Sequence, residues 1–193
     1  MFSSVKRVVE PAIEPVSLEE LRLHLRLDTE DIDTLLSLYI SAARDVIERY
    51  VRRQLLTASF ELWCPSFAQK ITLPYPPLQS VDTIIYLDLT GAETVLSATT
   101  YVVNTIATPG EMTLALNATM PSTQLTFGSD AVRIGYTAGY GAKASDVPAP
   151  LRAAVLLCAA DLFENPTAQV DQRLQENKTL CSLLYSYRLI EAA

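Results

Sequence analysis

The sequence predicts an α+β protein in which a helical bundle, formed by the N- and C-terminal helices, carries an inserted antiparallel β subdomain. Residues 1–56 and 147–193 contain apolar side chains at the three- and four-residue spacing of amphipathic or buried helices. Residues 57–146 are instead rich in threonine, valine, isoleucine, tyrosine, proline and glycine, which favours β structure. Neither helical end alone offers much of a core, so we expect the two ends to pack together. These three ranges are the predicted domains.

The composition indicates a folded protein without membrane contact. The chain has 193 residues, of which 49% are hydrophobic and 19% charged, unlike a disordered chain. Its longest candidate for a membrane span, Leu151–Ala160, is about half of the roughly 20 residues that a bilayer crossing needs. No apolar core of a signal peptide follows Lys6 and Arg7. We therefore expect a protein that is made in the cytosol.

The net charge and the cysteine content argue against nucleic-acid binding, lipid binding, zinc binding and a disulfide framework. The 15 basic and 22 acidic residues give a net charge of -7, which disfavours high-affinity binding to nucleic acid or anionic lipid. The three cysteines are odd in number and lack the spacing of a zinc knuckle; they are Cys64, Cys158 and Cys181. We expect buried thiols and no disulfide framework.

Two helices are predicted in the N-terminal region. Ser17 and Glu20 have the spacing of a capping box, so a short helix should begin at Leu18. The acidic run 28–31 interrupts that helix and suits the first turn of a second one. From residue 32 to residue 51, apolar side chains recur with helical spacing over about six turns.

Four arginines crowd the second half of this long helix. They are Arg44, Arg49, Arg52 and Arg53. Cations there oppose the negative end of the helix dipole. We interpret them as a solvated face, with a contact to an acidic partner as the alternative.

The middle of the chain predicts short strands. The candidates are Ser59–Trp63, Lys70–Leu73, Val81–Leu87, Glu93–Leu96, Tyr101–Asn104, Glu111–Ala115 and Ala131–Tyr136. Residues 88–91 would form a hairpin turn, because Gly91 can adopt a positive φ. Three prolines, Pro74, Pro76 and Pro77, place their segment at an edge or in an exposed loop.

The C-terminal region predicts two more helices. The stretch Leu151–Phe163 is almost continuously apolar, which is typical of a helix buried on most sides, and Asn165 with Pro166 ends it. A polar stretch, residues 167–178, follows. The last helix is marked by Leu180, Leu183, Leu184 and Tyr187.

No motif for catalysis or ligand binding stands out. His24, the single histidine, lies in an apolar helix without metal-ligand spacing, so we interpret it as a packed or rim residue. The chain lacks a Gly-x-Ser-x-Gly elbow, and its glycine-rich segment 135–141 lacks the Lys-Ser/Thr of a nucleotide loop. Carboxylates that are close in sequence, such as Asp31 and Asp33, are explained by the preference for acidic residues at the start of a helix. We predict no enzymatic activity, no cofactor and no metal.

A helix-turn-helix DNA-binding protein is the alternative function, because Ser17–Leu21 followed by a second helix superficially fits that unit. Two features argue against it. Acidic residues at positions 28–33 lie where a recognition helix would approach phosphates, and the second helix is unusually long.

Several segments, in their order along the chain, carry a resemblance to a known family. They are Glu14–Leu21, His24–Arg26, Leu35–Tyr50, Leu73–Val81, Tyr86–Asp88, Val132–Gly141 and Val147–Arg152. Together they resemble tailed-phage head-tail connectors, the adaptor proteins also labelled phage connectors or possible DNA-packaging proteins. The resemblance covers most of the chain, although the β block is rather long for the family.

The resemblance implies a structural role. It implies a ring of about twelve copies beneath the portal protein at the head vertex, with a stopper or tail terminator on the opposite face. DNA would pass through the ring without sequence-specific binding, which the acidic balance of the chain suits. The expected location is the neck of the virion, after assembly in the host cytoplasm.

The resemblance also maps candidate contacts. The portal-binding tail would be Thr179–Ala193, with candidate contacts Leu180, Leu183, Leu184, Tyr185, Tyr187 and Arg188. A ring subunit needs two different complementary surfaces, because head-to-tail contacts close a ring. Aromatic or apolar residues in exposed-looking segments are candidate anchors for subunit or neck contacts. These are Tyr75, Leu78 and Tyr140.

Overall fold

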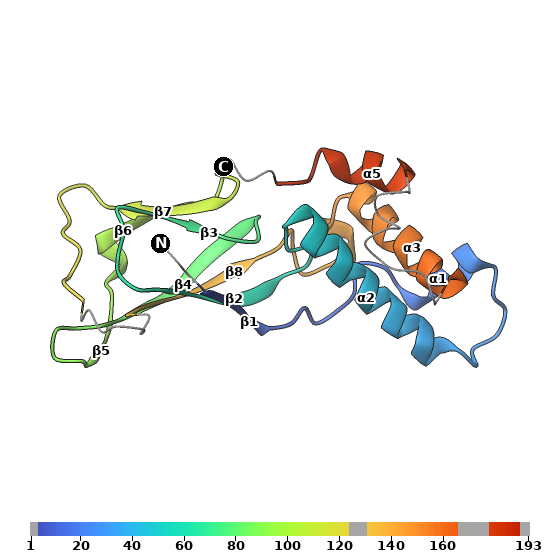
Figure 1. Ribbon diagram of the computed structural model, residues 1–193, viewed down its shortest axis with the longest axis horizontal. Coiled ribbons are helices and arrows are strands. Elements are labelled where there is room, and N and C mark those ends of the chain that lie inside the picture. The colour runs from blue at the N-terminus through green and yellow to red at the C-terminus, as the bar shows by residue number, and fades with distance from the viewer. Residues whose placement is uncertain (1–3, 124–130, 166–177, 190–193) are drawn as a thin grey trace. The chain divides into compact units, whose positions relative to one another are not determined.

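The computed structural model describes residues 4–123, 131–165 and 178–189 (Figure 1). The chain divides into two compact units. The β unit comprises Met1–Glu10 and Thr57–Tyr140, and the helical unit comprises Pro11–Leu56 and Gly141–Ala193. Helices and antiparallel sheets together confirm the predicted α+β class.

Five antiparallel strands form the main sheet of the β unit, in the order β1-β2-β8-β4-β5. Their bounds are Ser4–Val9 (β1), Ala58–Cys64 (β2), Val132–Ala138 (β8), Leu78–Leu87 (β4) and Glu93–Val95 (β5). Along β2 and β8, buried and half-buried residues alternate, because successive side chains of a strand point to opposite faces. The β-favouring composition of the sequence predicted both strands to within two residues at each end.

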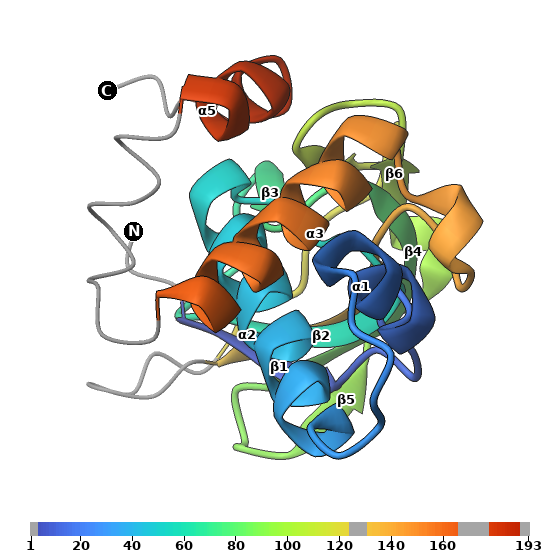
Figure 2. The ribbon, with the colours of Figure 1, turned by 90° about the vertical axis from the view of Figure 1, so that its right-hand side faces the viewer.

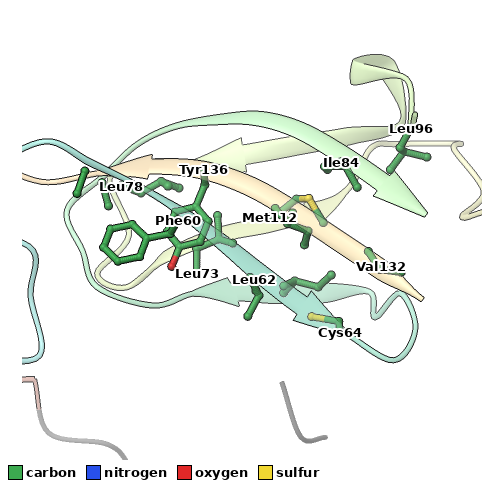
Figure 3. Close-up of a cluster of buried hydrophobic side chains, with 14 residues drawn as sticks. Phe60, Leu62, Cys64, Leu73, Leu78, Ile84, Leu96, Met112, Val132 and Tyr136 are labelled. Atoms are coloured by element: carbon green, nitrogen blue, oxygen red, sulfur yellow. The ribbon is translucent and has the colours of Figure 1, made fainter. Parts of the chain in front are cut away.

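A second sheet of the β unit has three strands in the order β3-β7-β6. These are Lys70–Leu73 (β3), Gly110–Leu114 (β7) and Tyr101–Asn104 (β6), with a 3-10 turn, Ala98–Thr100, before β6. The two sheets contribute to one hydrophobic core, in which Leu73 and Met112 from this sheet join Phe60, Leu62 and Val132 from the main sheet (Figure 3). Burial of these side chains is the main stabilising contribution to the unit.

An aromatic stack lies in this core. The rings of Phe60 and Tyr136 are 5.4 Å apart between centroids and inclined by 20°. Tyr136 is fully buried, and its hydroxyl donates a hydrogen bond to the carbonyl oxygen of Pro74 at 3.1 Å. Burial raises the pKa of Tyr136 well above its usual value, with a further contribution from Tyr75. The side chain therefore stays neutral and supplies both apolar area and one satisfied hydrogen bond.

The turn between β4 and β5 is the hairpin that the sequence predicts. Gly91 has a φ of 84°, and its N–H donates to the carbonyl oxygen of Asp88 at 3.0 Å. The Oδ1 atom of Asp88 accepts from the Thr90 hydroxyl at 2.6 Å and from the N–H groups of Thr90 and Ala92. These bonds to the ionised form lower the pKa of Asp88, that from the Thr90 hydroxyl most.

The prediction that all of residues 1–56 belong to the helical bundle is wrong at the N-terminus. Strand β1 pairs with β2, with Val5 opposite Leu62 and Arg7 opposite Phe60, and belongs to the β unit. The register of β1 shifts after Arg7, and its last residues are exposed. Exposed and half-buried residues therefore alternate over only a few positions, too few to predict a strand from the sequence. The structure also divides the chain after Tyr140, whereas the sequence suggested residue 146.

The helical unit holds four helices among the described residues. They are Leu18–Leu25 (α1), Asp33–Val51 (α2), Ala149–Glu164 (α3) and Lys178–Tyr185 (α5), with a 3-10 turn, Ala144–Asp146, before α3. Helix α3 contacts α1, α2 and α5, as Figure 2 shows. It therefore supplies much of the core, which also explains its nearly continuous apolar sequence. Helices from both ends of the chain pack together within this unit, and the predicted polar stretch 167–178 lies outside the described residues except for Lys178.

The start of α1 is a capping box, as predicted. The Ser17 hydroxyl accepts from the Glu20 N–H at 3.1 Å, and a Glu20 carboxylate oxygen accepts from the Ser17 N–H at 2.7 Å. Arg152 of α3 completes the arrangement by donating to Glu20 at 2.5 Å and to the carbonyl oxygen of Pro15 at 3.0 Å. Two segments of the family resemblance, residues 14–21 and 147–152, are thus joined by direct bonds.

The contribution of Glu20 to stability should depend on pH. The hydrogen bond from the Ser17 N–H lowers the pKa of Glu20 from 4.5, and Arg152 lowers it further, against partial desolvation. Because the pKa is lowered by folding, the stabilisation is present above the unfolded pKa and is lost as the pH falls through the folded pKa. We expect Glu20→Gln to be less stable than wild type near neutral pH, with a difference that shrinks below pH 4.5. Urea unfolding across a pH series measures this, and a difference that stays constant through the acid range would contradict it.

Candidate assembly surfaces

The predicted portal-binding residues lie in α5 and the turn that follows it. Leu180 and Leu184 are buried, which corrects their predicted role as surface contacts: they lie one helical turn apart and form the face that α5 buries within the helical unit. The candidates that remain accessible are Leu183 and Tyr187, which are half-buried, and Tyr185 and Arg188, which are exposed. Tyr185 is 81% exposed, an unusual state for an aromatic side chain.

The turn after α5 is fastened to the end of α2. Three contacts hold it: the Leu189 N–H donates to the Val51 carbonyl at 3.1 Å, Arg53 Nε donates to the Tyr187 carbonyl at 2.6 Å, and the Arg188 guanidinium lies 5.1 Å from the Tyr50 ring centroid. The last contact is a cation–π interaction. The accessible side chains of this segment therefore have a defined position on the helical unit. Residues 190–193 of the predicted tail lie outside the described residues.

Tyr75 and Leu78, two of the predicted interface anchors, follow β3 in the β unit. Tyr75 has a φ of 58°, which is unusual for a bulky residue, and stacks on Phe60 at 5.3 Å while remaining partly exposed. Leu78 is buried against Gly110, where an added Cβ would lie 2.5 Å from the Leu78 side chain. Leu78 is therefore a core residue, and its predicted role as a surface anchor is corrected.

The structure brings the third anchor, Tyr140, to the same end of the β unit. The N–H of Gly139 donates to the carbonyl oxygen of Pro77 at 2.9 Å, and the Gln79 side chain donates to the Gly139 carbonyl at 2.8 Å. Tyr140 itself is half-buried. The segment of Pro74, Pro76 and Pro77, which the sequence predicts at an edge or in an exposed loop, is less exposed than expected, because Pro76 is buried.

The arginines of α2 do not form one solvated face. Arg44 is only 6% exposed, and its guanidinium lies 3.5 Å from the Glu14 carboxylate and 3.4 Å from that of Asp45. Arg53 holds the C-terminal turn, as described above. Arg49 and Arg52 are exposed. The predicted solvated face is thus reduced to these two side chains.

Sequence reasoning missed an apolar surface at the other end of α2. Leu23 of α1 is 81% exposed, and Leu35 and Leu38 of α2 are 41% and 63% exposed. The sequence contains a signal for this surface, because Leu35 and Leu38 lie three positions apart and so share one face of the helix, whereas Leu36 and Ile40 lie on the core face. His24, beside Leu23, is exposed as well.

A cleft of about 380 Å³ in the helical unit offers no evident chemistry. It is lined mainly by Ile13, Val16, Leu18 and Ile40, together with Glu14, Ser17, Glu20, Ser37 and Ala144. Glu20 is engaged by Ser17 and Arg152, and one carboxylate oxygen of Glu14 accepts from the Ser41 hydroxyl at 3.0 Å. Such a lining suits packing against apolar groups rather than acid–base work.

The part of the chain that the structure describes holds no candidate for a metal site or a membrane-spanning helix. Within residues 4–123, 131–165 and 178–189, no three His, Cys, Asp or Glu side chains are grouped so that they could hold a metal ion. None of the helices in that part of the chain is long and apolar enough to span a bilayer. The thiols of Cys64 and Cys158 are buried, and that of Cys181 is half-buried.

Comparison with known proteins identifies the family. Residues 15–191 match the model of the phage gp6-like head-tail connector proteins. Three solved structures share the fold over 98% of this chain and 97% of theirs. They are the neck of an empty GTA particle computed with C6 symmetry (26% identity, TM-score 0.80), the virion of a native gene transfer agent (GTA) particle (26%, 0.76) and the neck of a native GTA particle computed with C12 symmetry (24%, 0.74). A comparison with curated proteins found no significant match.

The family match spans both the helical unit and the β unit, so it does not rest on one motif. The helix-turn-helix alternative gains no support from these comparisons. The chain belongs to the phage head-tail connector family and is a structural connector subunit.

Proposed function

We propose that this chain assembles into a ring of about twelve copies in the neck of a tailed phage or phage-like particle, where it joins head to tail and has no catalytic role. The observation that carries the proposal is the similarity, over 98% of the chain, to a GTA neck structure that was computed with sixfold symmetry. A ring of twelve copies is compatible with that symmetry. Assembly would take place in the host cytoplasm.

The portal protein is the proposed partner of the C-terminal segment. The surface consists of the accessible side chains Leu183, Tyr185, Tyr187 and Arg188. Aromatic and arginine side chains dominate the energetics of protein interfaces, because they bury large areas and also form polar contacts. A stopper or tail terminator would bind the opposite face of the ring, and Tyr75 and Tyr140 are the proposed anchors for subunit or neck contacts.

We propose that DNA passes through the ring without sequence-specific binding. A net charge of -7 supports this, because a binding surface for phosphates requires clustered cations. Repulsion between an acidic wall and the DNA backbone would prevent tight contacts during passage.

Tyr185 allows a direct test of the portal contact. Deleting everything after Lys178 would remove Leu180 and Leu184 and so damage the core, whereas Tyr185→Ala changes an exposed side chain and should leave the subunit folded. We expect this variant to attach to portal-bearing heads about tenfold more weakly, because it removes an aromatic anchor. Binding to purified heads and counts of tailed particles by electron microscopy measure the effect.

Tyr185→Phe is the matched control, because it keeps the apolar ring and removes only the hydroxyl. It should attach nearly as well as wild type. Wild-type attachment by the alanine variant, with normal circular dichroism, would show that Tyr185 is not an anchor of the portal contact. Absence of the wild-type chain from the neck of purified particles would overturn the proposed function itself.

A further inference from the structure

The two ends of α2 carry opposite charges. Asp28, Glu30 and Asp31, here called the acidic corner, are exposed in the connection before α2. Arg49 and Arg52, the basic end, are exposed at the opposite end of the helix. A helix of this length spans about 30 Å, several times the distance over which salt screens exposed charges. The two groups therefore do not neutralise each other within one chain.

The exposed leucines lie beside the acidic corner. Arg22, near the end of α1, donates to the Asp33 carboxylate at the start of α2, from Nε at 2.7 Å, so the end of α1 and the start of α2 are held together. Leu23 is the neighbour of Arg22, and Leu35 and Leu38 follow Asp33. Large apolar side chains exposed together beside charged residues are typical of a protein contact surface.

One face of α2 connects these features. Residues 35, 38, 42, 45 and 49 are spaced by three and four positions, so they form a stripe along one side of the helix. Leu35, Leu38 and Arg49 on this stripe are exposed, and Ala42 and Asp45 are half-buried. The stripe thus runs from apolar side chains near the acidic corner to cations at the basic end.

We propose that this stripe is the contact between neighbouring subunits of the ring, with the acidic corner of one copy facing the basic end of α2 in the next. The occupant is a second copy of this chain, because each copy carries both charges once, at opposite ends of the same helix. Repeating such a head-to-tail contact closes a ring when its rotation returns to the first copy, and builds an open filament when it does not. The leucines form the apolar centre of the contact, and the charges set its register, because a parallel alignment would place like charges opposite each other. This inference rests on the proposed function.

Charge reversal at each end, separately and together, tests the contact. One variant carries Asp28→Lys and Asp31→Lys, which leave Glu30 near Arg22 undisturbed, and a second carries Arg49→Glu and Arg52→Glu. A third carries all four changes. Each is expressed in particle-producing cells that lack the natural gene, circular dichroism of the purified variants checks folding, and mass spectrometry counts copies of the chain per particle.

Reversing the charges at one end alone should reduce incorporation about tenfold or more, because each such two-residue variant places like charges opposite each other at every subunit contact. The four-change variant should recover to within about threefold of wild type, because opposite charges face each other again. Co-expression of the two singly reversed chains should also restore incorporation, in alternating order around the ring. The proposed contact would be overturned if neither the four-change variant nor co-expression restored incorporation, or if reversing one end alone had no effect.

The size of the rescued assembly distinguishes a ring from an antiparallel pair, which would match the same charges. Sedimentation of assemblies released from particles should give a ring, and a two-chain species would overturn the head-to-tail arrangement. A wild-type chain that is missing from the neck would refute the proposed function, whereas a chain present in the neck whose reversals show no mutual rescue would refute this contact alone.

Discussion

Replacing Tyr136 with alanine should lower the free energy of unfolding of the β unit by about 3–5 kcal/mol. The side chain is fully buried at the centre of the main sheet, where it stacks on Phe60. Alanine would leave a cavity that the paired strands β2 and β8 cannot close without breaking their register. It would also leave the Pro74 carbonyl oxygen without the Tyr136 hydroxyl.

The single tryptophan gives a selective measurement of this loss. Trp63 lies in β2, with the Arg133 guanidinium 5.1 Å from its ring centroid, so its fluorescence reports unfolding of the β unit. Tyr136→Phe is the control, and it should cost only about 1 kcal/mol because it removes the hydrogen bond and keeps the ring. Equal effects of the two substitutions would mean that the hydroxyl, and not the stack, stabilises the unit.

Glu48→Ala should destabilise the helical unit by about 2–3 kcal/mol. Glu48 is 3% exposed, and its Oε1 atom accepts from the Gln54 side chain at 2.7 Å and from the Leu55 N–H at 3.0 Å. These bonds fold the chain back onto α2 directly after the helix ends. Alanine would leave two buried donors without this acceptor, which costs more than the net value of the bonds.

Thermal unfolding followed by far-UV circular dichroism measures this loss, because the helices dominate the signal. Glu48→Gln keeps the Oε1 acceptor and should lose less than half as much stability as the alanine variant. If the glutamine variant were as unstable as the alanine variant, the negative charge of Glu48, and not its role as an acceptor, would be the source of the stability.

Local features of the fold were predictable from the sequence. The capping box of Ser17 and Glu20 fixed the first residue of α1, because its two bonds join residues only three positions apart. Strands β2 and β8 were predictable from their β-favouring composition, and the turn at Gly91 from its need for a positive φ. Each of these signals depends on neighbours in sequence.

The features that were missed depend on partners far away in sequence. Strand β1 exists because β2, more than fifty residues later, offers it a ladder. Arg44 is buried because Glu14 lies beside it in the folded unit. By contrast, the separation of Leu180 and Leu184 from Tyr185 was available from helical geometry, because residues four apart share a face and the next residue does not.

The division of the chain between its two units limits how the molecule can be dissected. A fragment of residues 57–140 would contain most of the β unit but would lack β1. The outer edge of β2 would then present its backbone N–H and C=O groups unpaired, which is a template for pairing with other chains. Segments excised for separate study should therefore carry residues 1–10 as well, rejoined through a linker, or they will tend to aggregate.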